Sequence, residues 1–180
     1  MSKSFLNNHA VRGLRNNNPG NLIRTADAWQ GKIPFPQSKD AKFEQFTSLK
    51  WGLRAMLKDL IHDINKGKNT VTKLINEYAP KSENDTSSYI FNVCKTIGVK
   101  PDEKISAINN EFLILLVRAI LKVELGGSNS QVKDADIQEA LELLGDVSTT
   151  SLKVTIKKNW KPLIPALAFL AFFFVETLPR

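Results

Sequence analysis

Glu124 has the position of a general acid. It lies four residues after Ile120 and seven after Val117, so it extends the apolar stripe of a strongly hydrophobic helix. Desolvation and the negative end of the helix dipole both disfavour an ionised carboxylate at that place. A carboxyl group that keeps its proton near neutral pH can protonate a leaving group. Glu124 is therefore a candidate catalytic acid; the alternative is a water-facing side chain in the last turn before two glycines.

A second polar cluster, residues 82–86, contains two more acids. Asp85 stands where a helix is expected to begin, and an aspartate at such a place is typical of an N-cap. Glu83 lies just outside that helix, where the pattern gives it no structural role. Glu83 is therefore the second candidate for catalysis.

Other catalytic chemistries lack the residues that they need. The two histidines, His9 and His62, are far apart in the sequence, and the single cysteine, Cys94, falls at helical spacing with apolar residues. The sequence has no cluster of His and Cys ligands, no serine elbow and no phosphate loop. We expect no metal and no cofactor, and we expect Cys94 to be a small buried residue.

Five helices are expected to position these acids. Apolar residues recur at three- and four-residue steps within each of them, and capping residues or glycines mark the ends. The fourth has little polar surface before Gly126, so we expect it to be the central, buried helix. The predicted helices cover residues 51–65, 71–79, 86–97, 110–125 and 135–144.

Residues 1–47 differ from the helical part in being rich in asparagine, glycine and proline. The run from Asn16 to Asn21 favours turns and left-handed backbone. We expect an ordered loop region here, with short strands at residues 22–23 and 43–46. Together with the five helices it makes a mainly α domain over residues 1–145.

The composition changes again after this domain. Residues 146–161 contain Ser, Thr and four lysines and are expected to be a basic linker. Leu163 to Val175 carries no charge, but a helix of this length covers ~20 Å of a hydrocarbon core of ~30 Å, so flanking residues such as Trp160 must join the span. We expect residues 162–178 to anchor the chain in a membrane; the alternative is a core helix packed on the domain.

The charge distribution argues against a nucleic-acid partner. The chain has a net charge of +7, but residues 1–150 hold 20 Lys and Arg against 17 Asp and Glu, a balance of +3. No basic stripe and no nucleic-acid-binding motif accompanies this mild excess. The mild positive charge is compatible with binding to an anionic polymer such as a cell wall.

Several short motifs stand out. Residues 12–24 read RGLRNNNPGNLIR, and an Ala-Pro pair at residues 79–80 is followed by SENDT at residues 82–86 and by Tyr89. These motifs resemble a family of phage virion-associated lysins and structural proteins, and the resemblance covers residues 12–127. Further matches are WQG at residues 29–31, FEQF at 43–46 and WGLRAM at 51–56.

The same order of features is similar to bacterial cell-wall glucosaminidases of the lysozyme superfamily. In those enzymes an Asn-Leu loop precedes a Phe-x-x-Tyr strand pair, a helix and a Thr-Asp-x-x-Tyr segment. Their catalytic Glu comes before that loop, whereas Glu124, with Gly126 two residues further on, comes after it. The two resemblances together imply a circularly permuted lysozyme-like domain with Glu124 in the catalytic place.

The resemblance also implies peptidoglycan as the substrate. A lytic transglycosylase needs one acid: Glu124 would protonate the glycosidic oxygen and then, as a carboxylate, assist attack by the sugar's own 6-hydroxyl. A hydrolase needs a second carboxylate, ~5 Å away for retention or ~6.5–9.5 Å for inversion, and Glu83 or Asp85 is the candidate. The implied substrate contacts are Asn17, Asn18, Asn21, Asp85 and Tyr89.

A further resemblance, to tailless phages with an internal membrane, implies a place in the virion at that membrane. Other virion proteins and the lipid bilayer would be partners, and the expected function is cleavage of glycan strands during host entry. Two alternatives stay open. One is a non-enzymatic virion protein with a lysozyme-like fold that binds the wall or braces the capsid; the other is a lysis protein acting from the host inner membrane.

Overall fold

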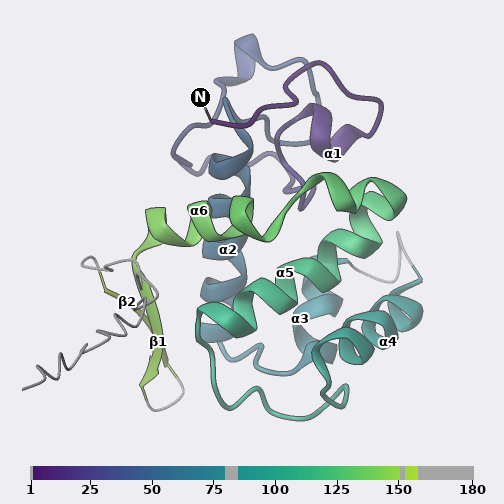
Figure 1. Cartoon of the computed structure of the whole chain (residues 1–180), viewed down its shortest axis with the longest axis vertical. Coiled ribbons are helices and arrows are strands. Elements are labelled where there is room, and N and C mark those ends of the chain that lie inside the picture. The colour runs from purple at the N-terminus through teal and green to yellow at the C-terminus, as the bar shows by residue number, and fades with distance from the viewer. Residues whose placement is uncertain (1, 80–84, 151–152, 158–180) are drawn as a thin grey trace, which may run out of the picture.

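Helices dominate the computed structural model, which describes residues 2–79, 85–150 and 153–157 (Figure 1). The mainly α fold expected from the sequence is confirmed, and the five predicted helices are present with ends that differ by at most two residues. The elements are α1 (Arg12–Arg15), η1 (Phe35–Gln37), α2 (Leu49–Asn65), α3 (Val71–Tyr78), α4 (Thr86–Ile97), α5 (Asn110–Leu125), η2 (Gly126–Gln131), α6 (Asp134–Leu144), β1 (Asp146–Thr150) and β2 (Lys153–Lys157).

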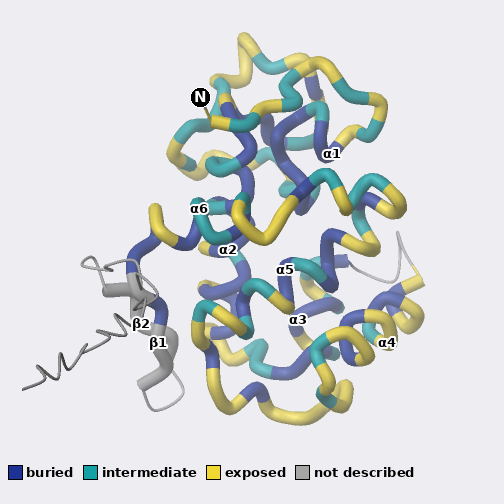
Figure 2. The backbone as a smooth tube through the Cα atoms, viewed as in Figure 1, coloured by how far each residue is buried: buried dark blue, intermediate teal, exposed yellow. Residues whose placement is uncertain are grey.

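The core lies among the long helices, with α6 packed on α2 and α4 packed on α5 (Figure 2). α2 buries ten of its residues and α5 seven. α5 leaves Leu115 43% and Val123 37% exposed, so α2, and not the more apolar α5, is the most buried helix. Full burial of one large apolar side chain stabilises the fold by roughly 1.5–3 kcal/mol, so the packing of α2 contributes strongly to stability.

Capping residues mark most helix starts as the sequence predicts. The side chains of Thr70, Asp85 and Asn109 each accept a hydrogen bond from the backbone N–H three residues further on. The start of α6 differs, because Asp134 is already helical and Lys133 is the N-cap. Its backbone N–H donates to a side-chain carboxylate of the first turn instead, that of Asp136 at 2.7 Å.

The asparagine-rich loop is buried rather than exposed. Asn17 and Asn18 are 0% exposed. The amide of Asn17 donates to the Phe46 carbonyl at 3.0 Å, and the amide of Asn18 donates to the Glu44 carbonyl at 3.0 Å. The loop and the segment around residue 45 are therefore tied together by side chains. Where short strands were predicted, the structure has single bridges, Ile23 with Phe43 and Lys32 with Phe46.

The predicted basic linker contains a β-hairpin. β1 and β2 pair antiparallel, with Val147 opposite Ile156, and Val147 is buried in the core. Three of the five residues in each strand are β-branched, which suits a pleated chain; the serines, threonines and lysines of this segment made it resemble a linker. The hairpin lies beside α2, α5 and α6.

The predicted membrane anchor, residues 162–178, lies outside the described residues. Among the residues that the structure describes, no helix combines the length and the apolar character needed to cross a bilayer. The C-terminal anchor therefore stays a prediction from the sequence.

Gly52 allows the asparagine-rich loop to touch α2. A Cβ atom at this position would lie 1.7 Å from the carbonyl oxygen of Asn17 and 2.8 Å from its carbonyl carbon. Both atoms belong to the backbone, so no side-chain rotation can relieve the clash. Any larger residue at position 52 must push the loop off the helix.

Gly52→Ala is expected to destabilise the protein by about 3 kcal/mol, at the upper end of what overpacking costs, because the loop backbone has to move. Gly127→Ala is the matched control, since nothing lies within 4 Å of a Cβ placed there, and its effect should stay within about 0.5 kcal/mol. Urea unfolding of the full chain measures both. Equal unfolding midpoints for the two variants would show that the loop does not rest on α2 as described.

Candidate active site

The Glu124 carboxylate lies in the last turn of α5, half-buried, where three parts of the chain meet. Its Oε1 accepts a hydrogen bond from the Tyr89 hydroxyl of α4 at 2.8 Å. Its Oε2 accepts one from the amide of Asn21, in the loop after α1, at 2.7 Å. The structure thus brings together three of the predicted site residues, and each comes from a different element.

Two tyrosines stand beside this carboxylate, Tyr89 buried and Tyr78 half-buried. Tyr89 is 4% exposed, and burial, the neighbouring Tyr78 and the charge of Glu124 raise the pKa of its hydroxyl above the usual value. Tyr78, in α3, donates its hydroxyl hydrogen to the carbonyl oxygen of Gly20. Burial, and then the charges of Glu124 and Asp59, raise the pKa of Tyr78 as well. Both hydroxyls are therefore neutral donors next to the carboxylate.

The backbone of the loop aims Asn21 at Glu124. Asn21 has a φ of +50°, in the left-handed region that asparagine tolerates better than most residues. Gly13 of α1 packs against this place, since a Cβ there would lie 3.0 Å from both the Asn21 Oδ1 and the Leu125 side chain. A short helix thus closes over the end of α5 and holds the loop against the carboxylate.

Asn17 and Asn18, predicted to contact substrate, do not reach this place. Their amide N–H groups donate to backbone carbonyls. Their side-chain oxygens accept hydrogen bonds from the backbone N–H groups of Phe5, at 2.8 Å, and Leu22, at 3.0 Å. A fully buried amide with its hydrogen bonds satisfied inside the protein has nothing to offer a ligand. In this structure the two asparagines brace the loop, and Asn21 alone of the three faces the site.

Asp85, one of the two acids of the polar cluster, is not bound to Glu124. Asp85 is exposed and caps α4, accepting hydrogen bonds from the Ser88 N–H at 3.1 Å and hydroxyl at 2.6 Å. These bonds lower the pKa of Asp85. Glu83, the second predicted catalyst, lies outside the described residues.

A cavity of about 250 Å³ opens beside the site, lined among others by Gly20, Asn21 and Tyr78. A second cavity, of about 400 Å³, continues over α2 past Lys58 and His62. The two cavities share Asp27, Trp29 and Asp59 in their linings. The two cavities together form a groove. The groove starts at Asn21, the hydrogen-bond partner of Glu124.

Asp59 and Trp29 are two groove residues that the sequence did not point to as site residues. Asp59 is half-buried and makes no hydrogen bond or ion pair within the described part of the chain; burial and the charges of Asp63 and Asp27 raise its pKa. Trp29 was seen only as part of a motif. On the helical pattern alone Asp59 falls on the polar side of α2, so no signal in the sequence marks it as a cavity residue.

No protein-family model matches the chain. A curated bacteriophage protein does match it, with 32% identity over 139 residues, which is 75% of this chain and 82% of the relative. The chain therefore belongs to a family of phage proteins. The relative is Protein P5 of Pseudoalteromonas phage PM2. The phage part of the resemblance is thereby confirmed, and the lysozyme-like part stays a prediction.

The chain contains two tyrosines, Tyr78 and Tyr89, and both should resist ionisation while the protein is folded. A raised pKa in the folded state gives a stabilisation that is fully present below the unfolded value of about 10 and is lost as pH rises above it. Ultraviolet absorbance of tyrosinate should therefore appear only together with loss of helical circular dichroism. In denaturant both phenols should titrate near pH 10; a tyrosinate signal at that pH in the folded chain would contradict the burial of the pair.

Proposed function

We propose that this chain is a peptidoglycan lytic transglycosylase in which Glu124 is the single catalytic acid and base. The observation that carries the proposal is the half-buried carboxylate of Glu124, which is held by Tyr89 and by Asn21, a residue that lines the groove. A lysozyme-like domain in circularly permuted order, implied by the sequence motifs, is part of the same proposal. The proposal assigns the following roles.

Glu124 first donates its proton to the glycosidic oxygen, and the bond from that oxygen to the anomeric carbon breaks. The carboxylate then removes the proton of the sugar's own 6-hydroxyl while that oxygen bonds to the anomeric carbon. The product is an anhydro-muramyl end, and Glu124 has its proton back. Tyr89 and Asn21 position the carboxylate, and each oxygen keeps a further lone pair for the substrate.

The groove supports a glycan as substrate. Trp29 offers an apolar ring against which a sugar can pack, and Asp59 and Asp27 offer oxygens that accept hydrogen bonds from sugar hydroxyls. The groove leads away from the neighbours of Glu124, which is the arrangement that a linear polymer requires. Asp59 is also the candidate for a second carboxylate should the reaction be hydrolysis, beside Glu83 of the sequence prediction.

Glu124→Gln in the full chain, held in a mild neutral detergent, is expected to lower the release of anhydro-muropeptides from purified sacculi by roughly 10²–10⁴-fold, since it removes the proton donor. Mass spectrometry identifies the products. Glu111→Gln is the matched control, because Glu111 is exposed in the first turn of the same helix, and it should leave the rate unchanged. Equal products from wild type and Glu124→Gln would move the acid to another residue such as Glu83, and reducing ends in place of anhydro ends would identify a hydrolase.

A second candidate function is supported by the same hydrogen bonds. Both oxygens of Glu124 are already bound by the protein, as in a structural clamp that ties α4, α5 and the loop together. A non-enzymatic virion protein that binds or braces the wall would keep such a clamp. It predicts saturable binding of the folded wild-type chain to sacculi without any new sugar ends in the experiment above.

The proposed location is the virion, at an internal membrane, with other virion proteins, peptidoglycan and the lipid bilayer as partners. Kinship with Protein P5 of a phage and the apolar segment at residues 162–178 support it. The chain should therefore be found by protein profiling of purified particles, and should leave them with the lipid when detergent removes it. Presence in the host inner membrane and absence from particles would instead identify a lysis protein.

A further inference from the structure

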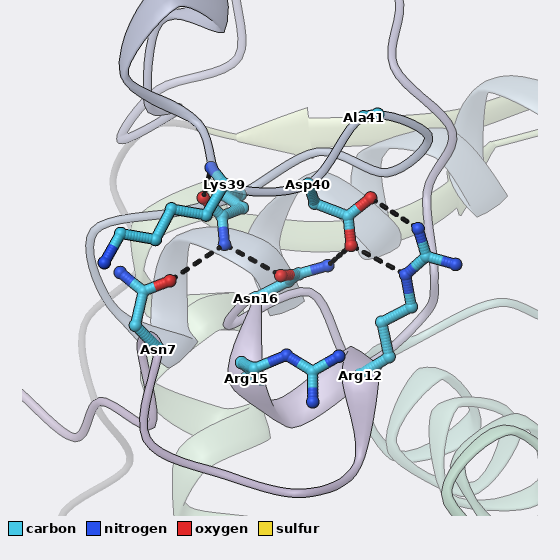
Figure 3. Close-up of a pocket in the computed structure, with 8 residues that line it drawn as sticks. Asn7, Arg12, Arg15, Asn16, Lys39, Asp40 and Ala41 are labelled. Atoms are coloured by element: carbon cyan, nitrogen blue, oxygen red, sulfur yellow. Dashed lines mark hydrogen bonds and ion pairs between the residues drawn. The ribbon is translucent and has the colours of Figure 1, made fainter.

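A separate concave site lies at the α1 end of the asparagine-rich loop, where Asn16 is part of its lining. It is a cavity of about 420 Å³ between α1 and the segment around residue 40. Figure 3 shows Asn7 and Lys39 on one side of it, Arg12 on the other, and Asn16 and Arg15 between them. None of these residues takes part in the site around Glu124. This cavity, the basic pocket, is therefore separate from the candidate active site.

The floor of the basic pocket is a continuous chain of hydrogen bonds that joins three buried side chains to the exposed Asn7 (Figure 3). The Gln45 amide donates to the oxygen of Asn16 at 2.8 Å and to that of Asn7 at 3.3 Å. The Asn16 amide donates to Asp40 at 2.7 Å. Asn16, Gln45 and Asp40 are 1%, 2% and 6% exposed. A polar floor that is satisfied in this way is rigid before any ligand arrives.

Asp40 fixes Arg12 at the rim. The guanidinium donates through Nε and Nη2, both at 2.7 Å, to the two carboxylate oxygens. It also lies 4.5 Å above the ring of Phe43. The hydrogen bond from Arg12 is the largest influence that lowers the pKa of Asp40, so the pair stays ionised. Arg12 is nevertheless partly exposed. Its remaining N–H groups point away from Asp40, and the ion pair with Asp40 fixes the plane of the guanidinium.

Two further cations are left without a carboxylate. Arg15 uses Nη1 on the backbone carbonyls of His9 and Ala10, at 3.0 and 2.7 Å, which holds it in place without neutralising it. Lys39 makes no ion pair through its ammonium group within the described residues and is exposed. Asp40 balances Arg12, so the basic pocket carries two uncompensated positive charges.

We propose that the basic pocket binds a phosphate group. Phosphate at neutral pH carries between one and two negative charges and has several acceptor oxygens, which matches the charge of Arg15 and Lys39 and the free donors of Arg12. A planar guanidinium held at a fixed angle is the donor best suited to two oxygens of one oxyanion. The phosphate comes either from a soluble molecule or from a lipid headgroup. The proposal is independent of the reaction assigned to Glu124.

The test is isothermal titration calorimetry of the full chain in a mild neutral detergent with inorganic phosphate at neutral pH and low salt. Arg15→Gln with Lys39→Gln is expected to weaken binding at least about tenfold, since one hydrogen bond to a charged group accounts for that much. The matched control, Lys66→Gln with Lys73→Gln, removes two exposed charges elsewhere and should leave the affinity within about twofold. Lys39→Gln alone, at an exposed side chain that the fold does not use, keeps the test valid if the double variant unfolds.

Vesicles of phosphatidylcholine with or without phosphatidic acid separate the two sources. A gain of vesicle binding with phosphatidic acid that the double variant loses assigns the pocket to a lipid headgroup. Phosphate binding that depends on Arg15 and Lys39, with no such gain, assigns it to a soluble ligand. No heat from inorganic phosphate, or equal affinity of wild type and double variant, overturns the proposal whatever the chain does to peptidoglycan.

Discussion

Burial of the asparagine-rich loop against α2 is the constraint on which the rest of the structure depends. Gly52 lets the backbone of Asn17 touch the helix, and a loop so close to a core helix cannot hydrogen-bond to water. Its backbone groups must therefore find partners inside the protein: the N–H groups of Asn17 and Asn18 donate to carbonyls of α1, and the Asn16 carbonyl accepts from the Phe46 N–H. The side chains of Asn17 and Asn18 in turn bind the backbone of the neighbouring segments. With its middle fixed, the loop holds Asn16 in the floor of the basic pocket and Asn21 on the carboxylate.

The position of Glu124 follows from the same constraint. The last turn of α5 would be free to fray if nothing held it. Asn21 and Tyr89 hold it, because each donates a hydrogen bond to one carboxylate oxygen of Glu124. Tyr78 adds a tie from α3 to the loop through the carbonyl of Gly20. Three helices and the loop thus converge on one acid without any metal-ligand cluster in the described residues. Such convergence buries polar groups, and burial of a polar group costs free energy unless the group is hydrogen-bonded.

Much of this arrangement could be predicted from the sequence, because helices have a periodic pattern and an apolar stripe shows which side chain continues it. Glu124 was found in that way, and Tyr89 through a motif. Contacts between distant segments have no such pattern. Asp59 looks like a polar-face residue until the loop of Trp29 is placed beside it. The hairpin of β1 and β2 was missed because lysines among its β-branched residues resemble a linker.

The most specific motif of the sequence has a structural role rather than a chemical one. An amide that is fully buried tolerates no substitution of size or hydrogen-bonding pattern, since an unpaired buried polar group costs about 1–3 kcal/mol. Asn17 and Asn18 are such amides. A motif that contains them therefore indicates how the loop folds and says little about a reaction. Asn21, partly exposed and bound to Glu124, is the member of the motif that bears on chemistry. The motif therefore bears on how this loop folds, and the reaction has to be judged from Glu124 and its two partners.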